Sequence, residues 1–140
     1  MTDRQRCVLG DVGGTDDNLV TMDYSFDLLA IASGGKLYYW DETTVKQVTD
    51  PDLGLVLDVV WVDGYFMTTD GEFLVVTELL DPFAVNPLKY GSSEIDPDPV
   101  TSIIKLRNEI YAVNRHTIEV FNNVGGSLFP FQRVNGAQIQ

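Results

Sequence analysis

Few residues of this chain have the chemistry of a catalytic centre. Its 140 residues include one histidine, His116, and one cysteine, Cys7. A serine, histidine and aspartate triad or a histidine metal site would need His116, which directly follows a predicted hairpin turn at Arg115. A single cysteine allows neither an internal disulfide nor a multi-cysteine zinc site. We therefore predict no catalytic residue, no metal site and no cofactor site.

Two acidic stretches have the residue types that calcium prefers. They hold Asp11, Asp16 and Asp17 in the first, and Glu94, Asp96 and Asp98 in the second. Neither follows the D-x-[DN]-x-[DN]-G spacing that wraps one cation. A proline follows both Asp96 and Asp98 and favours an extended loop. We interpret both stretches as solvated acidic loops.

A glycine pair followed by lysine, Gly34-Gly35-Lys36, superficially resembles a phosphate-binding loop. The earlier glycine of that motif is missing, and Leu37 stands where a serine or threonine would hold magnesium. The pair is more typical of a hairpin turn.

Carboxylates and tyrosines leave a carbohydrate-active enzyme as an alternative function. The candidate residues are Glu78, Tyr90, Glu109 and Tyr111. Glycoside hydrolysis needs two carboxyl groups roughly 5 to 10 Å apart, and the sequence does not indicate that any two converge. Two carboxylates and an arginine in one concave pocket would favour this alternative.

The charge distribution argues against extensive contact with nucleic acid. The chain has 9 basic and 21 acidic residues, and nineteen of the acids lie in residues 1–100. Residues 101–140 are locally basic, with four bases and two acids. An acidic surface repels a phosphate backbone. No run of 18 apolar residues predicts a membrane span, and the N-terminus lacks a signal-peptide core, so we expect synthesis in the cytoplasm.

A repeated unit organises the middle and the end of the chain. Residues 58–77 align with residues 102–121 at an offset of 44, apolar position on apolar position. Within the first copy, Asp63-Gly64 and Asp70-Gly71 separate β-rich runs, as expected of tight hairpin turns. Asn114-Arg115 is the corresponding turn in the second copy. A unit of this length that forms a small antiparallel sheet is typical of a β-propeller blade.

A weaker copy precedes these two. It runs through LLAIAS, the turn Gly34-Gly35 and KLYYW, and it places Gly35 opposite Gly71 at an offset of 36. A fourth, outer strand is predicted in each unit, at residues 44–48, 84–90 and 129–134. Pro87 and Pro130 cannot donate ladder hydrogen bonds, which suits an edge strand.

The expected fold is all-β: a β-propeller section of about three four-stranded antiparallel blades, near residues 18–50, 56–90 and 101–134. Residues 1–17 are expected to form a flexible lead-in. Recognition by propellers is carried by the long polar connections at blade ends. The interface candidates in these connections are Glu94, Asp96, Asp98, Asn122 and Asn123.

Three stretches carry a family resemblance: GYFMTTDGEF, TELLDPFAVNPLKYGSSEIDPDP and RNEIYAVNRHTIEVFNN. With them, residues 26–140 resemble the packaged-DNA stabilisation proteins of P22-like short-tailed phages, which are tail accessory or head-closure factors. Proteins of this family are considerably longer, so we expect the chain to be a fragment.

The resemblance implies a non-enzymatic virion protein of the tail or neck. Such a protein closes the portal and stabilises packaged DNA through contacts with the portal or neck protein, the tail needle and the tailspike. An open arc of blades would also expose sheet faces, so we expect self-association. A cellular propeller scaffold, unrelated to phage, is the remaining alternative.

Overall fold

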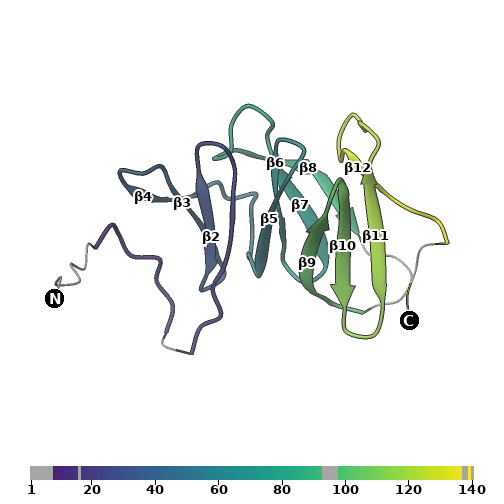
Figure 1. Cartoon of the computed structure of the whole chain (residues 1–140), viewed down its shortest axis with the longest axis horizontal. Helices are drawn as coiled ribbons and strands as arrows, with labels where there is room; N and C mark the ends of the chain where they lie inside the picture. The colour runs from purple at the N-terminus through teal and green to yellow at the C-terminus, as the bar shows by residue number, and fades with distance from the viewer. Residues whose placement is uncertain (1–7, 16, 93–97, 137–138, 140) are drawn as a thin grey trace, which may run out of the picture.

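The computed structural model describes residues 8–15, 17–92, 98–136 and 139, and this part of the chain contains strands and no helix (Figure 1). Twelve strands form three four-stranded antiparallel sheets, so the predicted all-β fold is confirmed. The first sheet consists of β1 (Thr21–Tyr24), β2 (Leu29–Ser33), β3 (Lys36–Trp40) and β4 (Val45–Gln47). The second consists of β5 (Asp58–Val62), β6 (Tyr65–Thr69), β7 (Phe73–Thr77) and β8 (Val85–Ser92). The third consists of β9 (Val100–Leu106), β10 (Glu109–Asn114), β11 (Ile118–Asn123) and β12 (Phe131–Arg133).

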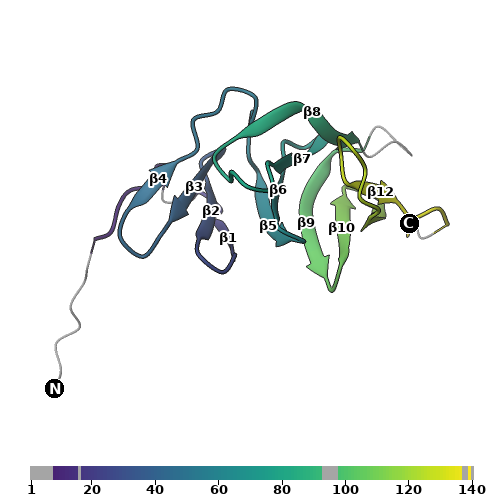
Figure 2. The ribbon, with the colours of Figure 1, turned by 90° about the horizontal axis from the view of Figure 1, so that it is seen from above.

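The three sheets stand side by side as successive blades of an open arc (Figures 1 and 2). Strand order within each sheet follows the chain, from an inner strand to an outer one. The inner strands meet, β1 against β5 and β5 against β9. The first and third blades therefore each have one face that no other blade of the described residues covers.

Apolar side chains fill the two layers between the blades. Between the first and second blades, Leu37 and Tyr39 pack with Val59 and Phe66. Between the second and third, the side chains are Val60, Val62, Met67, Leu74, Val76, Ile103, Ile110, Ala112 and Phe121. Each large apolar side chain so buried contributes roughly 1.5 to 3 kcal/mol to folding. Packing between blades, more than any single sheet, holds the arc together.

Strand pairing confirms the offset of 44 between the second and third blades. Val59 pairs with Thr68, and the residues 44 positions later, Ile103 and Ala112, pair with each other. The offset of 36 between the first and second blades is wrong. The β2 and β3 pairs become β6 and β7 pairs only when 37 is added, as when Ala32↔Leu37 becomes Thr69↔Leu74.

The error of one residue matters because neighbouring residues of a strand point to opposite faces. At the correct offset Leu37 corresponds to Leu74, and both face the next blade in the arc. Glycine misled the alignment: Gly34, not Gly35, corresponds to Gly71, and all three have positive φ.

The predicted turns differ in type. Asp63-Gly64 is a two-residue turn with positive φ at both positions, 50° and 91°. At the next turn only Gly71 has positive φ, and the Asp70 carboxylate instead accepts hydrogen bonds from the backbone of Glu72 and Phe73. The predicted turn at Asn114-Arg115 is wider than two residues, because Val113 pairs with Ile118.

The fourth strand of each blade is an outer edge strand, as expected. Pro87 lies inside β8, where the register shifts and residues 86–89 bulge away from β7. Pro130 precedes β12 instead of lying within it. A residue without an N–H is tolerated at both places, because neither requires it to donate to the ladder.

The described part of the lead-in crosses the first blade. Ser33 Oγ donates to the carbonyl of Gly13 (3.4 Å), and Gly10 lies so close to Val45 that a Cβ there would fall 2.6 Å from Val45 Cβ. Residues 10–14 therefore contact β2 and β4. Residues 1–7 and 16, including Cys7 and Asp16, lie outside the described residues.

Candidate interface site

The structure describes three of the five predicted contact residues, Asp98, Asn122 and Asn123. Glu94 and Asp96 lie outside the described residues. Asp98 is buried, Asn122 is half-buried and Asn123 is exposed. Of these three described residues, Asn122 and Asn123 lie together at the end of β11.

Asp98 braces the connection between the second and third blades. Its carboxylate accepts a hydrogen bond from the backbone of His116 and lies 3.5 Å from the hydroxyl of Thr117. The connection is thereby held to the loop that joins β10 and β11. His116, the sole histidine, is exposed on that loop and contributes its backbone to the brace.

Asn123 joins two blades. Its Nδ2 donates to Asp63 Oδ2 (3.1 Å), on the turn between β5 and β6, and its Oδ1 accepts from the backbone of Gly125 (2.9 Å). Beside this contact lies a groove of about 740 Å³. Its lining consists of Asp63, Leu106, Arg107, Asn108, Glu109, Tyr111, Asn122 and Asn123. The groove lies between the turn that joins β5 and β6 and the third blade.

The groove contains two carboxylates and an arginine, the set that would favour glycoside chemistry. The Tyr111 hydroxyl donates to Glu109 Oε2 (2.8 Å). This hydrogen bond, with the nearby negative charge, raises the pKa of Tyr111 above its ordinary value. A tyrosine nucleophile needs the opposite shift, so Tyr111 is held as a neutral donor.

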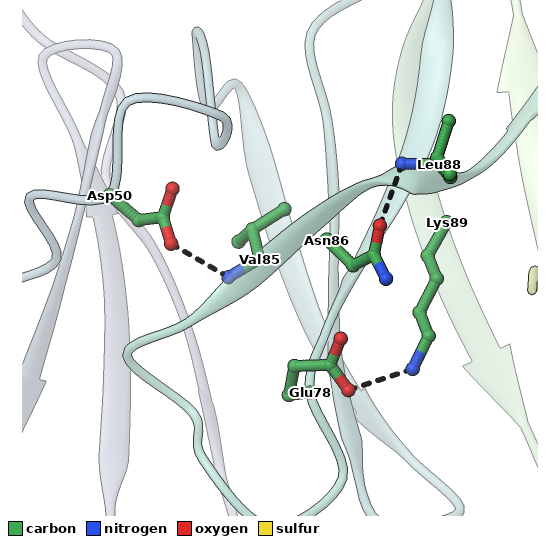
Figure 3. Close-up of polar contacts among 6 residues, drawn as sticks. All are labelled: Asp50, Glu78, Val85, Asn86, Leu88 and Lys89. Carbon is green, nitrogen blue, oxygen red and sulfur yellow. Dashed lines mark hydrogen bonds and ion pairs between the residues drawn. The ribbon is translucent and has the colours of Figure 1, made fainter.

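The other two residues of the carbohydrate alternative, Glu78 and Tyr90, lie elsewhere. Glu78 forms an ion pair with Lys89 of β8, with 2.7 Å between Oε2 and Nζ (Figure 3). Tyr90 stacks edge-on against Phe73, with ring centroids 5.2 Å apart. The four candidates therefore do not converge.

The first half of the outer edge at β8 has its backbone donors occupied by nearby side chains (Figure 3). Asp50 Oδ2 accepts from the backbone of Val85 (3.0 Å), and Asn86 Oδ1 accepts from the backbone of Leu88 (3.0 Å). Pro87, between them, has no N–H. Blocked donors of this kind prevent edge-to-edge aggregation. A partner at this rim would contact side chains instead of extending the sheet.

Side chains suited to such a contact do surround the rim. A hollow of about 610 Å³ opens between β8 and the end of the third blade. Leu88, Tyr90 and Leu128 line it, and each is about half exposed or more. Gly91 makes room for the Phe129 ring, because a Cβ there would collide with it.

Two aspartates that the sequence analysis missed join the inner strands. Asp23 Oδ2 of β1 accepts from the backbone of Trp61 on β5 (2.7 Å), and Asp58 Oδ2 of β5 accepts from the backbone of Ile103 on β9 (3.0 Å). Asp23 Oδ2 also lies 3.7 Å from Lys105 Nζ. The available signal was an acid within or at the start of a predicted inner strand.

Within the described residues, no three histidine, cysteine or acidic side chains gather as a metal site would require. No helix of the described part is long and apolar enough to cross a membrane.

Solved structures resemble this fold at low sequence identity. The computationally designed Ika4 protein matches 93% of this chain and 78% of its own, with a TM-score of 0.58 and 18% identity. Hsv2 of Kluyveromyces marxianus matches 86% of this chain and 39% of its own, with a TM-score of 0.50 and 13% identity. These likenesses concern the fold alone. No curated protein matches the chain.

Stacked four-stranded sheets joined at their inner strands define a β-propeller protein. The family described as bacteriophage P22 Gp10, β-propeller, matches residues 2–140. The chain belongs to this family, which confirms the resemblance found in its sequence. It is thereby a phage structural protein, of the family that stabilises packaged DNA, and a component of the virion.

Proposed function

We propose that the chain acts at the head-to-tail junction of a short-tailed phage, where it closes the portal and retains packaged DNA through protein contacts. The observation that carries the proposal is the family match over residues 2–140. Its partners would be the portal or neck protein, the tail needle and the tailspike. The protein would be made in the host cytoplasm and would function in the tail or neck of the virion.

The net charge of −12 supports contact with proteins instead of DNA, since phosphates would be repelled. We assign the partner contact to the outer rim around Leu88, Tyr90 and Leu128. Aromatic and large apolar side chains are typical of the centre of an interface. Asn122 and Asn123 stay predicted contact residues within the groove.

The test is capture of the chain by the portal ring of a phage that encodes it. We expect binding by the parent chain and at least a tenfold weaker affinity for Tyr90→Ser with Leu88→Ser, because two apolar anchors are lost. Leu80→Ser is the matched control, since Leu80 is an exposed leucine outside this hollow. No binding by the parent chain, or equal binding by all variants, would contradict the assignment.

Glycoside hydrolysis is the second candidate function, favoured by one observation. Asp63, Glu109 and Arg107 line the same groove. The raised pKa of Tyr111 opposes a tyrosine nucleophile. Release of sugar from a glycoside panel by the parent chain, lost in Glu109→Gln, would establish this activity in place of a purely structural role.

A further inference from the structure

The two outer blades of the arc carry complementary free faces. The free face of the third blade, turned away from the second blade, consists of Ile104, Leu106, Tyr111, Val113 and Ile118. The corresponding face of the first blade, turned away from the second, carries Met22, Tyr24, Leu29, Ile31 and Tyr38, of which Ile31 and Tyr38 are buried and Met22 and Tyr24 are exposed. Alternation along the strands places each set on one side of its sheet.

The repeat shows what the third blade's free face would pack against. Ile104 and Leu106 correspond to Val60 and Val62, 44 positions earlier. Val60 and Val62 are 8% and 2% exposed because the third blade covers them, whereas Ile104 and Leu106 are 53% and 57% exposed. The same positions are covered in one blade and bare in the next.

The first blade has an exposed face at the other end of the arc, because no preceding blade covers its inner strand in the described residues. Met22 and Tyr24 correspond to Val59 and Trp61, 37 positions later, which pack against the first blade. Met22 and Tyr24 are 58% and 72% exposed. Within the described part of the lead-in, residues 10–14 cover the part of this face near β2 and β4 and leave Met22 and Tyr24 of β1 exposed.

The charges of the first and third blades indicate which partner fits the free face of the third blade. Residues 101–134 carry four bases and two acids, whereas residues 18–50 carry five acids and two bases. Asp63 and Asn123 form a polar contact between the second and third blades. The repeat shows which residues stand at the same two positions where the third blade would meet a first blade. Asp63 corresponds to Arg107 at an offset of 44, and Asn123 corresponds to Glu42 at an offset of 81 (44 plus 37). An arginine and a glutamate would then occupy the two sides of the contact.

We propose that the free face of the third blade binds the free face of the first blade in a second copy of this chain, head to tail. Ile104 and Leu106 of one copy pack on Met22 and Tyr24 of the other, and Arg107 lies opposite Glu42. Because the contact is heterologous, copies of this three-bladed unit add to one another head to tail. The inference goes beyond the proposed function and does not require portal binding.

The test measures the mass of the whole chain by light scattering after size-exclusion chromatography, across micromolar concentrations. We expect multiples of the 15.6 kDa chain mass. Ile104→Ser with Leu106→Ser should weaken association at least tenfold while the circular dichroism spectrum and thermal midpoint stay near those of the parent, because both side chains are already half exposed.

Charge reversal tests the orientation. Arg107→Glu and Glu42→Lys should each weaken association about fivefold, and the double variant should recover most of the loss, as expected of one exposed ion pair. Arg115→Glu is the matched control, because Arg115 is an exposed base on the opposite loop of the third blade. A monomeric parent chain, or a double variant weaker than either single one, would overturn the proposal.

Cross-linking tests the contact directly. In a Cys7→Ser background, chains carrying Ile104→Cys are mixed with chains carrying Tyr24→Cys. Oxidation should give a disulfide-linked heterodimer in preference to either homodimer. Equal amounts of all three products would contradict the head-to-tail arrangement.

Discussion

The carboxylate of Asp58 joins the second blade to the third, through a 3.0 Å hydrogen bond from the backbone nitrogen of Ile103. Its other oxygen accepts from the backbone of Val59 (2.8 Å). Asp58 is buried, and inner strands have no neighbour to pair with on one side. The aspartate thus supplies acceptors that the sheet itself lacks, and it fixes the distance between two blades.

Replacing Asp58 with alanine should destabilise the arc by about 2 to 4 kcal/mol, because two buried N–H groups lose their acceptor. Urea unfolding followed by tryptophan fluorescence measures the change. Asp27→Ala, at an exposed aspartate of the turn before β2, should stay within about 0.5 kcal/mol of the parent. An Asp58→Ala chain as stable as this control would show that the hydrogen bonds contribute nothing.

The two contacts of Asp23 should contribute unequally to stability. Its bond from the Trp61 backbone is short and partly buried, whereas Lys105 is at 3.7 Å and a third exposed. We expect Asp23→Ala to cost about 1 to 3 kcal/mol and Lys105→Ala less than about 1 kcal/mol. Unfolding at low and at 1 M salt should show that only the lysine effect is screened. Equal costs would mean that the ion pair, not the backbone bond, dominates.

Asp50 should make stability depend on acid pH. Hydrogen bonds from the backbone of Val85 and Asp52 hold the pKa of its carboxyl below the ordinary value. A lowered folded-state pKa stabilises the fold above the unfolded pKa of about 4, and this stabilisation is lost as pH falls through the folded value.

The difference in unfolding free energy between the parent and Asp50→Asn should therefore be constant from pH 6 to 8 and should shrink below about pH 4. Urea midpoints across this range measure it. Asp52→Asn serves as the control, because the Asp52 side chain accepts no hydrogen bond within the described part of the chain. A difference that persists at pH 2.5 would contradict a role for the ionised carboxylate.

Sequence reasoning recovered the blades because their strands are short, apolar and bounded by turn residues. Asp63-Gly64 is an example: few residue pairs adopt positive φ at two successive positions without strain, so these two residue types predict the turn. The offset of 44 followed from six matched apolar positions, from Val59 with Ile103 to Val76 with Val120. The family resemblance then assigned a structural role that no individual residue indicates.

The face of each strand in the first blade could not be derived the same way. Two adjacent glycines, Gly34 and Gly35, both accept positive φ, so aligning either with Gly71 satisfies the turn. Only strand pairing decides between them. Asp98 was misjudged for a related reason: a loop aspartate looks solvated until the loop it faces, 18 residues later, is placed in space.

The final prediction concerns Tyr39, which anchors the connection between β7 and β8 to the first blade. Its hydroxyl donates to the carbonyl of Pro82 (2.7 Å), and its ring meets Phe83 edge-on at 5.0 Å. Burial, with the negative charge of Asp81, raises its pKa, so the hydroxyl stays a donor throughout the physiological range. Tyr39→Phe keeps the ring packing and removes one hydrogen bond, which should cost about 1 kcal/mol.

Tyr38→Phe is the matched control, because the neighbouring Tyr38 faces the other side of the same strand and its hydroxyl makes no hydrogen bond among the described residues. Hydrogen exchange supplies the second measurement: the amides of Phe83 and Ala84 should exchange faster in Tyr39→Phe and be unchanged in Tyr38→Phe, because only the first substitution releases the Pro82 carbonyl. Unchanged exchange in both chains would show that Phe83 packing alone holds the connection. The two outcomes distinguish a polar anchor from an apolar one at the point where the outer strand of the second blade begins.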